Sequence, residues 1–211
     1  MITQSGFAFH PRLSALQPKG GLLEGGRRDR KIPAGGASRV SHGSLGWERS
    51  AMTTEYHSIA PVFDEKSRIL ILGSFPSIKS REIGFFYGHP QNRFWKTLAK
   101  LFGEDVPSST EEKRSFLLSH NIALWDVIAS CEITGSSDSS IRNAVPNEVE
   151  KILKDTHIER IFTNGGTAHR LYCRYLQPKT GIEAICLPST SPANAAWTQS
   201  RLEDAWKVIL K

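Results

Sequence analysis

Four short apolar runs are spaced along the chain, and each ends in small or polar residues. They span Arg68–Ser74, Asn121–Val127, Ile158–Asn164 and Glu183–Ser189. Continuous apolar runs of this length are typical of strands that are buried on both faces of a parallel sheet. We therefore predict four parallel strands.

The segments between these runs have the periodicity of helices. Arg93–Phe102 places its large apolar side chains on one face, and Ser109 with Glu112 forms the capping box of a helix through about Ser119. Further helices are predicted over 147–154, with Pro146 suited to its first turn, over 167–176 and over 196–210. The buried stripe of the last helix is expected to be Leu202, Ala205, Trp206, Ile209 and Leu210. This alternation predicts an α/β fold, a three-layer α/β/α sandwich with a central parallel sheet of about four strands.

The four predicted strands end in sequences that suit ligand binding. Ligands of open parallel sheets bind outside the carboxyl ends of the strands. In this chain those ends read GSFPS, WDV, TNGG and LPSTSPAN. Small or polar residues at all four ends predict one functional site at this edge of the sheet.

The first 51 residues differ from the rest in composition and charge. They hold 8 Lys/Arg and 3 Asp/Glu, whereas residues 52–211 hold 19 and 18. Their Gly, Ser and Arg content without periodicity favours a disordered tail, or a start site assigned too early with Met52 as the true first residue. A transit peptide is the remaining alternative. We expect the folded domain to span 52–211, and its near-neutral charge does not by itself indicate nucleic-acid binding.

The cysteines and the hydropathy pattern limit the compartment and the cofactors. Cys131, Cys173 and Cys186 are odd in number and lack metal-binding spacing, so we expect reduced thiols, no structural metal and no disulfide. No apolar run approaches the roughly 18 residues of a membrane span. We therefore expect a cytoplasmic protein that does not enter membranes, with organellar targeting by the first 51 residues as the alternative.

The sequence FFYGHPQNRFW joins two aromatic clusters through a polar kink. Asn92 precedes the predicted helix and either caps it or presents its amide to a ligand. His89 is either a loop residue or a catalyst. Phe86 and Tyr87 belong either to the core or to a pocket that stacks on a flat ligand.

The ends of the third and fourth runs also have two interpretations each. Ser189, Thr190 and Ser191 lie in a loop stiffened by two prolines, where hydroxyls and backbone N–H groups suit phosphate binding. The same residues also suit a turn that caps the last helix. Asn164 either reads the edge of a base through its amide or tolerates a tight turn.

These motifs, in this order, resemble the uracil-DNA glycosylase superfamily, in particular its DNA-deoxyinosine (hypoxanthine-DNA) glycosylase branch. The motifs are GSFPS, FYGHPQNRFW, LWDV, TNG and LPSTSPAN, and the resemblance covers about residues 59–211. The HPQNRFW block is also similar to that of the mismatch-specific uracil/thymine glycosylases. The resemblance implies an α/β/α enzyme that flips a deaminated base out of DNA and hydrolyses its N-glycosidic bond. We expect it to act as a monomer without a cofactor.

The resemblance also implies roles for individual residues. Many relatives carry Asp or Asn in the first motif to position the attacking water, and this chain has Phe75 there. In the deoxyinosine branch the Asn of the HPxNxFW block is held important for activity, and the resemblance assigns this role to Asn92. The base-binding set is Phe75, Phe86, Tyr87, His89 and Asn164. The DNA-binding set is Ser77, Ser189, Thr190, Ser191 and Pro192, of which the loop residues are expected to enter the minor groove.

The expected chemistry follows from the leaving group. A deaminated base takes up developing charge well, so the bond can break with oxocarbenium character while a neutral amide orients water and stabilises the base. No lysine lies in these motifs, which predicts a monofunctional glycosylase without a Schiff base. Deoxyinosine is the favoured substrate, with uracil or xanthine as alternatives.

Several alternatives remain open from the sequence. Asp126 is interpreted as a structural residue that orients a backbone amide or a helix terminus, with a general base as the alternative. A serine hydrolase would use Ser74 or Ser77 with His89, although GSFPS lacks the nucleophile-elbow pattern. A non-catalytic nucleic-acid-binding module would explain Phe75 as a loss of chemistry.

Overall fold

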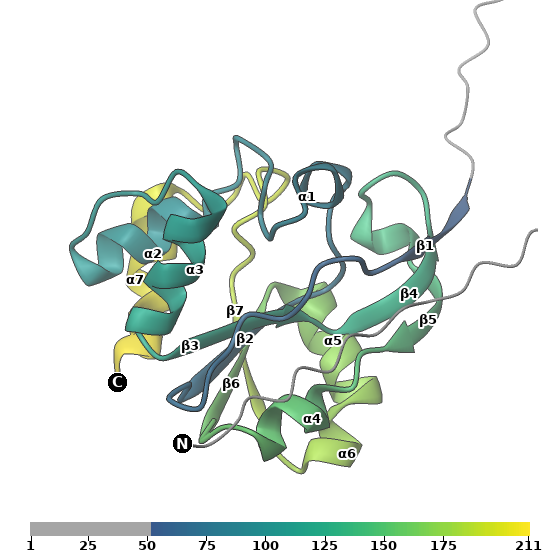
Figure 1. The fold of residues 1–211 in the computed structure, drawn as a ribbon. Coiled ribbons are helices and arrows are strands. Elements are labelled where there is room, and N and C mark those ends of the chain that lie inside the picture. Colours follow the sequence, from purple (N-terminus) through teal and green to yellow (C-terminus); the bar gives the residue numbers. More distant parts are fainter. Residues whose placement is uncertain (1–51) are drawn as a thin grey trace, which may run out of the picture. The chain divides into compact units, whose positions relative to one another are not determined.

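The computed structural model describes residues 52–211, and the tail predicted over 1–51 lies outside the described residues. A four-stranded parallel sheet forms its centre, in the order β3-β2-β6-β7 (Figure 1). The strands are β2 (Ile69–Gly73), β3 (Ile122–Asp126), β6 (Arg160–Asn164) and β7 (Ala184–Leu187). The predicted α/β/α class and the four parallel strands are therefore confirmed.

Burial along the sheet follows the position of each strand. All five residues of β2 are buried, because β3 and β6 pair with its two edges and helices cover both faces. The last strand, β7, pairs only with β6, and Ile185 in it is 42% exposed. The prediction of burial on both faces is thus correct for the central strand and wrong for this edge strand.

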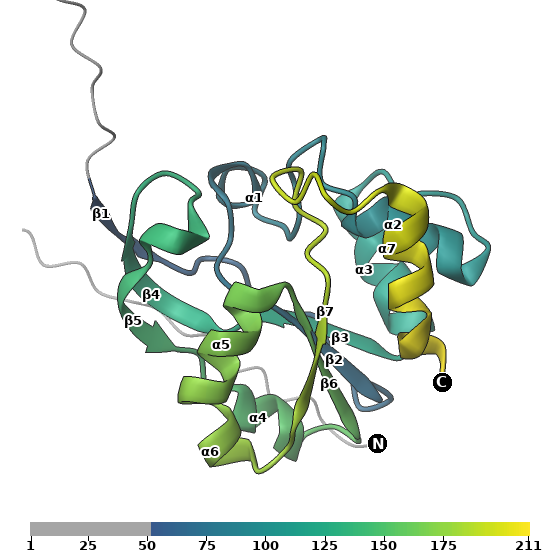
Figure 2. The same ribbon diagram turned by 180° about the vertical axis from the view of Figure 1, so that it is seen from behind.

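Two hydrophobic cores lie on opposite faces of the sheet. Ile69 and Ile71 of β2 pack with α2, α3 and α7, whereas Leu70 and Leu72 pack with α4 and α5. The two views of the ribbon show these helix layers on either side of the strands (Figures 1 and 2). The helices are α2 (Phe94–Phe102), α3 (Thr110–Ser119), α4 (Val149–Lys154), α5 (Gly166–Tyr175), α6 (Gln177–Thr180) and α7 (Gln199–Trp206).

Local signals placed some helix ends correctly and others wrongly. The predicted capping box of Ser109 and Glu112 is present at the start of α3. Pro146, however, ends a strand, and α4 begins only at Val149. The last helix begins at Gln199, and residues after Trp206 tighten into the 3-10 helix η2 (Lys207–Leu210), which leaves Leu210 47% exposed instead of buried.

A second, antiparallel sheet was not predicted from the sequence. It has the order β1-β4-β5, with β1 (Thr53–Tyr56), β4 (Ile128–Ile133) and β5 (Arg142–Pro146). Its outer strands are mostly exposed, so they lack the apolar signal of the central sheet. The short helix α1 (Ile78–Ile83) and the 3-10 turn η1 (Asp138–Ser140) complete the described elements. No helix within residues 52–211 is long and apolar enough to span a membrane.

Candidate active site

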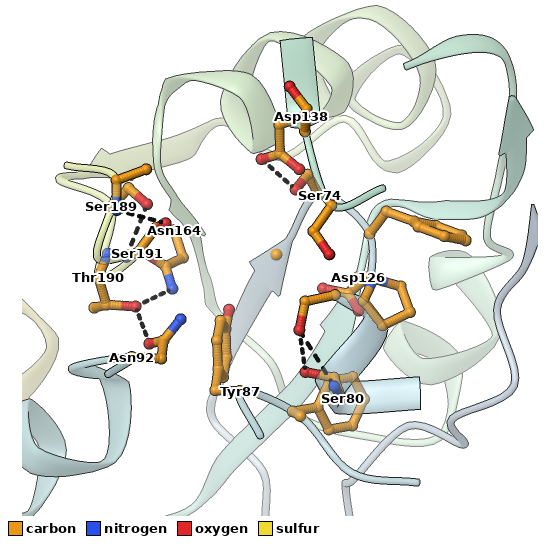
Figure 3. Close-up of a pocket in the computed structure, with 18 of the residues that line it drawn as sticks. Ser74, Ser80, Tyr87, Asn92, Asp126, Asp138, Asn164, Ser189, Thr190 and Ser191 are labelled. Carbon is orange, nitrogen blue, oxygen red and sulfur yellow. Dashed lines mark hydrogen bonds between the residues drawn. The ribbon is translucent and has the colours of Figure 1, made fainter. Parts of the chain in front are cut away.

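A cavity of about 440 Å³ lies at the carboxyl ends of β2, β3 and β6, beneath the loop that follows β7 (Figure 3). Most of the site residues predicted from the sequence line it. They are Phe75, Ser77, Phe86, Tyr87, Asn92, Asn164, Ser189, Thr190 and Ser191. His89 and Pro192 are not among the lining residues. His89 instead accepts a local hydrogen bond from the backbone N–H of Gln91 at 3.1 Å, and Pro192 is exposed on the loop.

Asn92 holds its carboxamide in one orientation. Its Oδ1 accepts the backbone N–H of Phe94 at 3.0 Å and the hydroxyl of Thr190 at 2.9 Å. The first contact caps the start of α2, which was one of the two interpretations of Asn92 from the sequence. Arg93 directly precedes the helix, so Asn92 caps it from one position further back. The Nδ2 group has no partner among the described residues and lies on the side of Tyr87 in Figure 3. Asn92 therefore offers the cavity a donor, not an acceptor.

Asn164 and Thr190 join β6 to the loop after β7. The Asn164 amide donates to the Thr190 hydroxyl at 2.9 Å, and its oxygen accepts the Thr190 backbone N–H at 2.9 Å. The Thr190 hydroxyl then donates to Asn92. Three elements distant in sequence are thus connected by one chain of hydrogen bonds, and Thr190 is completely buried. The predicted contact of Asn164 with a base stays a prediction.

Arg93, which the sequence did not single out, holds the same loop in place. Its guanidinium donates to the backbone carbonyls of Ser191 at 2.8 Å, of Asn194 at 3.1 Å and of Trp197. Its own backbone N–H donates to the Thr190 carbonyl at 3.1 Å. An arginine beside a polar loop usually suggests a charge partner, so this use of carbonyl acceptors has no clear signal in the sequence.

Tyr87 forms an aromatic wall in a conformation that a side chain of this size rarely adopts. Its φ is 52°, and its ring stacks on Phe94 with centroids 3.9 Å apart. Its hydroxyl is buried without a hydrogen-bond partner among the described residues. Burial, reinforced by the negative charge of Asp126 and only partly opposed by the nearby Asn164 amide, which is not within hydrogen-bond geometry, raises the pKa of Tyr87 well above its ordinary value, so the hydroxyl stays protonated. Strained backbone and an unpartnered buried hydroxyl are both unusual, and they often mark functional sites.

Phe75 and Phe86 are almost buried, at 8% and 2% exposure, and both still line the cavity. Each ring centroid lies 6.1 Å from the ring of His57. They are therefore core residues that present an edge or face to the cavity, so the two interpretations of these aromatics are compatible. His57 follows β1, in a segment that carries no functional motif.

Asp126 ends β3 and lines the cavity with 3% of its surface exposed. Its Oδ2 lies 2.9 Å from Nε2 of His57, and its backbone carbonyl accepts the side chain of Asn147 at 2.9 Å. The side chain therefore contacts a histidine, not the backbone amide or helix terminus that was the favoured interpretation of the sequence. The carboxyl group lies next to Gly73 at the end of β2, together with the Tyr87 hydroxyl, and we call this part of the cavity its inner end.

Asp138, which the sequence analysis also missed, is a second carboxyl group in the lining. Ser74 donates its hydroxyl to Oδ2 of Asp138 at 2.7 Å. Burial raises the pKa of Asp138, the Ser74 hydrogen bond opposes that rise, and the charge of Asp126 adds to it. Its surroundings, GSSDSS, are typical of an ordinary loop, which explains why no motif pointed to it.

The geometry does not support a serine hydrolase. Ser74 donates to a carboxylate, Ser77 contacts Ser80 at the start of α1, and His89 is bonded to its own loop. Within residues 52–211, no serine of the cavity has a histidine as its hydrogen-bond partner. The same residues contain no group of three or more His, Cys, Asp or Glu placed to hold a metal ion.

Comparison with known proteins assigns the family. The model of the uracil DNA glycosylase superfamily matches residues 60–210. Two archaeal proteins named hypoxanthine DNA glycosylase are similar to the chain. The one from Methanosarcina acetivorans is 34% identical over 151 residues, which cover 71% of this chain and 94% of the relative. The one from Methanosarcina barkeri is 36% identical over 154 residues, which cover 72% and 95%.

A solved structure agrees with this assignment. The solution NMR structure of a candidate uracil DNA glycosylase from Methanosarcina acetivorans superimposes with a TM-score of 0.63 at 30% identity. The match covers 75% of this chain and all of that one. The sequence motifs, the sheet order and these similarities agree, and the chain belongs to the uracil DNA glycosylase superfamily.

Proposed function

We propose that the protein is a monofunctional DNA glycosylase that flips a deaminated base into the cavity and hydrolyses its N-glycosidic bond. Hypoxanthine is the favoured base, and uracil and xanthine are further substrates. Family membership and the two relatives named hypoxanthine DNA glycosylase support this proposal. The observation that carries it is the Asn92 amide, which is fixed by two hydrogen bonds so that its NH₂ group is directed to the cavity.

Asn92 suits stabilisation of the leaving base better than activation of water. Activating a water requires an acceptor for its proton, and Oδ1 already accepts two hydrogen bonds. A donor held in a sheltered site instead stabilises the negative charge that develops on the base as the bond to C1′ breaks. The sequence-based role of Asn92 is thereby narrowed to that of a hydrogen-bond donor.

The aromatic residues explain how a flipped base is retained. Phe75, Phe86 and Tyr87 offer apolar surface to a planar ring on the walls of the cavity. Flipping costs a few kcal/mol, least where the base pair is already weakened, as with deaminated bases. Stacking offsets part of that cost.

The loop with Ser189, Thr190 and Ser191 is proposed to hold the DNA backbone, together with Ser77 at the start of α1, which also lines the cavity. Arg93 holds this loop before DNA arrives, so little additional ordering is needed on binding. No lysine of residues 52–211 lines the cavity, which supports hydrolysis without a Schiff base or strand cleavage.

We also propose that residues 52–211 form the active domain and that it acts on DNA as a cytoplasmic monomer. Deleting residues 1–51 should leave the rate on an inosine duplex unchanged. Size-exclusion chromatography with light scattering should give the mass of one chain. A large loss of rate, or the mass of a dimer, would contradict the respective statement.

One experiment tests the function. End-labelled duplexes that contain inosine, uracil, xanthine or only normal bases are incubated with the protein and then treated with alkali to cleave abasic sites. We expect alkali-dependent cleavage at inosine and none in the undamaged duplex. Cleavage before alkali treatment would contradict the monofunctional mechanism. Binding to lesion DNA without any abasic product would favour a non-catalytic module, which the presence of Phe75 in the first motif would then explain.

A further inference from the structure

The inner end of the cavity contains two polar atoms that no described residue satisfies. One is Oδ1 of Asp126, since only Oδ2 of this carboxylate is hydrogen bonded. The other is the Tyr87 hydroxyl. Both lie over Gly73 at the end of β2, because a Cβ atom at that position would be 2.1 Å from Oδ1 and 3.1 Å from the hydroxyl. Asn92, Tyr87 and Asp126 lie in that order across the cavity in Figure 3.

His57 determines the hydrogen-bonding character of Asp126. Its Nδ1 accepts the backbone N–H of Ile59 at 3.2 Å, so this nitrogen carries no proton. The proton of the neutral ring is therefore on Nε2, which donates to Oδ2 of Asp126 at 2.9 Å. The His57 side chain is only 2% exposed, so water does not compete for either contact. Asp126 must accept from His57, and its second oxygen is directed to the cavity as another acceptor.

We propose that Asp126, oriented by His57, accepts the ring N–H of a deaminated base while the Tyr87 hydroxyl donates to the adjoining carbonyl. This inference rests on the proposed function and names its specificity determinant. Asp126 and Tyr87 are the specificity-determining residues, and His57 is a positioning residue.

The edges of the bases explain why this arrangement distinguishes hypoxanthine and uracil from adenine and cytosine, the bases from which they form by deamination. Hypoxanthine and xanthine carry N1–H next to the O6 carbonyl, and uracil carries N3–H next to a carbonyl. Adenine and cytosine present an unprotonated ring nitrogen beside an amino group, which reverses both roles. A hydroxyl can reverse its role by rotation, but a carboxylate has no donor. Asp126 therefore places lone pair against lone pair when adenine or cytosine enters, and such a mismatch in a desolvated site rejects a ligand strongly.

The substitution Asp126→Asn is expected to change which base is preferred, and not only to weaken binding. Because His57 still donates through Nε2, the substituted amide turns its oxygen toward His57 and its NH₂ group toward the cavity. A donor then replaces the acceptor at constant shape. We expect the variant to favour adenine over hypoxanthine, the reverse of the wild-type preference.

Binding of non-hydrolysable DNA tests the inference separately from catalysis. Two duplexes carry 2′-fluoroarabino-hypoxanthine or 2′-fluoroarabino-adenine opposite an abasic-site analogue, so that no base pair has to be broken. Dissociation constants are measured by fluorescence anisotropy for the full chain and for Asp126→Asn. We expect wild type to bind the hypoxanthine duplex roughly 10–100-fold more tightly, and the variant to lose or reverse that preference. An unchanged preference in the variant would overturn the inference, as would equal affinity of wild type for both duplexes.

Tyr87→Phe provides a second test if Asp126→Asn does not fold. It removes only the hydroxyl and should weaken binding of the hypoxanthine duplex roughly tenfold, with a smaller change for adenine. Unchanged affinities would contradict the inference. Cleavage of an ordinary inosine duplex is measured on the same wild-type preparation. Cleavage without a binding preference would overturn the inference alone, whereas a preference without cleavage would overturn the proposed hydrolase and support the inference.

Discussion

The loop side and the inner end of the cavity differ in how completely their polar atoms are hydrogen bonded. On the loop side, Asn164, Thr190, Asn92 and Arg93 form a continuous network that leaves one amide NH₂ group free. At the inner end, the Tyr87 hydroxyl has no partner among residues 52–211. A saturated network keeps its shape without a ligand, whereas an unsatisfied one gains free energy when a ligand binds.

This difference indicates that the two sides have different roles within one site. The loop side fixes geometry before DNA arrives, and the inner end keeps binding capacity for the base. Backbone strain is found at the inner end, where Tyr87 adopts a left-handed conformation. Variants on the loop side should therefore change rate or DNA affinity, while variants at the inner end should change base binding and stability in opposite directions.

The largest expected effect comes from the free NH₂ group of the loop side. Asn92→Asp keeps an oxygen to accept from Phe94 and Thr190 but replaces the donor with a second oxygen. We expect kcat on an inosine duplex to fall about 10²–10³-fold in Asn92→Asp and in Asn92→Ala alike, as when one donor to a developing anion is removed. Single-turnover rates measure this loss.

These two variants distinguish the role of the Asn92 NH₂ group as a donor from the role of the Asn92 oxygen as a helix cap. Asn92→Ala should also lower the free energy of unfolding by about 1 kcal/mol, because it removes the cap, whereas Asn92→Asp should stay close to wild type. If Asn92→Asp retained nearly full activity, Asn92 would act as an acceptor and the contrast between the two sides would fail.

Arg93 should give the next largest effect, on DNA binding. Arg93→Lys retains the positive charge but not the fork that reaches the carbonyls of Ser191, Asn194 and Trp197. The loop then has to be ordered during binding, so we expect KM to rise roughly tenfold with a smaller change in kcat. Steady-state kinetics on the inosine duplex measure both. A fall in kcat at constant KM would show that Arg93 takes part in the reaction and does not merely position the loop.

Asp138, the second carboxyl group in the cavity lining, permits a test through pH. Burial raises the pKa of this group above its ordinary 3.8, so the folded state holds a proton that the unfolded state releases. The contribution of Asp138 to stability should therefore be greatest below that ordinary value and decline as pH rises through the higher pKa of the folded state. Urea titrations of wild type and Asp138→Asn measure this contribution as the difference between their free energies of unfolding, and we expect wild type to lose stability relative to the variant as pH rises across this range.

A matched variant checks the cause of that decline. Ser74 donates to Asp138 and opposes the rise of its pKa. Ser74→Ala should therefore extend the decline of stability to higher pH. An identical pH dependence in wild type and Asp138→Asn would show that another group is responsible.

The sequence predicted the parts of the molecule that depend on local pattern. Apolar runs located the central strands, and the capping box located α3, because both signals are carried by adjacent residues. The antiparallel sheet lacks such a signal, since its outer strands are short and exposed. The resemblance of their motifs to the uracil-DNA glycosylase superfamily, not local pattern, predicted Asn92 and Thr190 as site residues, and both line the cavity.

The rest of the site depends on contacts between distant segments. His57 and Asp126 are 69 residues apart, and β1 and the segment after it have no motif that links them to β3. Asp138 lies in a segment with the composition of an ordinary loop. Arg93 donates to backbone carbonyl groups, and since every residue carries one, the sequence does not indicate which of them it contacts. These residues determine which hydrogen-bond donors and acceptors line the cavity, and only their placement in three dimensions reveals it.

Beside its effect on base binding, Tyr87→Phe should change stability by a small amount, and the direction of that change is the most informative of the series. The variant keeps the ring that stacks on Phe94 and removes a buried hydroxyl without a partner. It should therefore raise the free energy of unfolding by about 1 kcal/mol, because an unsatisfied polar group is no longer desolvated. Thermal unfolding measures this gain, and a loop-side variant that removes a satisfied hydroxyl, Thr190→Val, should lose stability instead. If Tyr87→Phe were destabilising, the hydroxyl would be satisfied in the free protein, and the inner end would differ from the loop side only in shape.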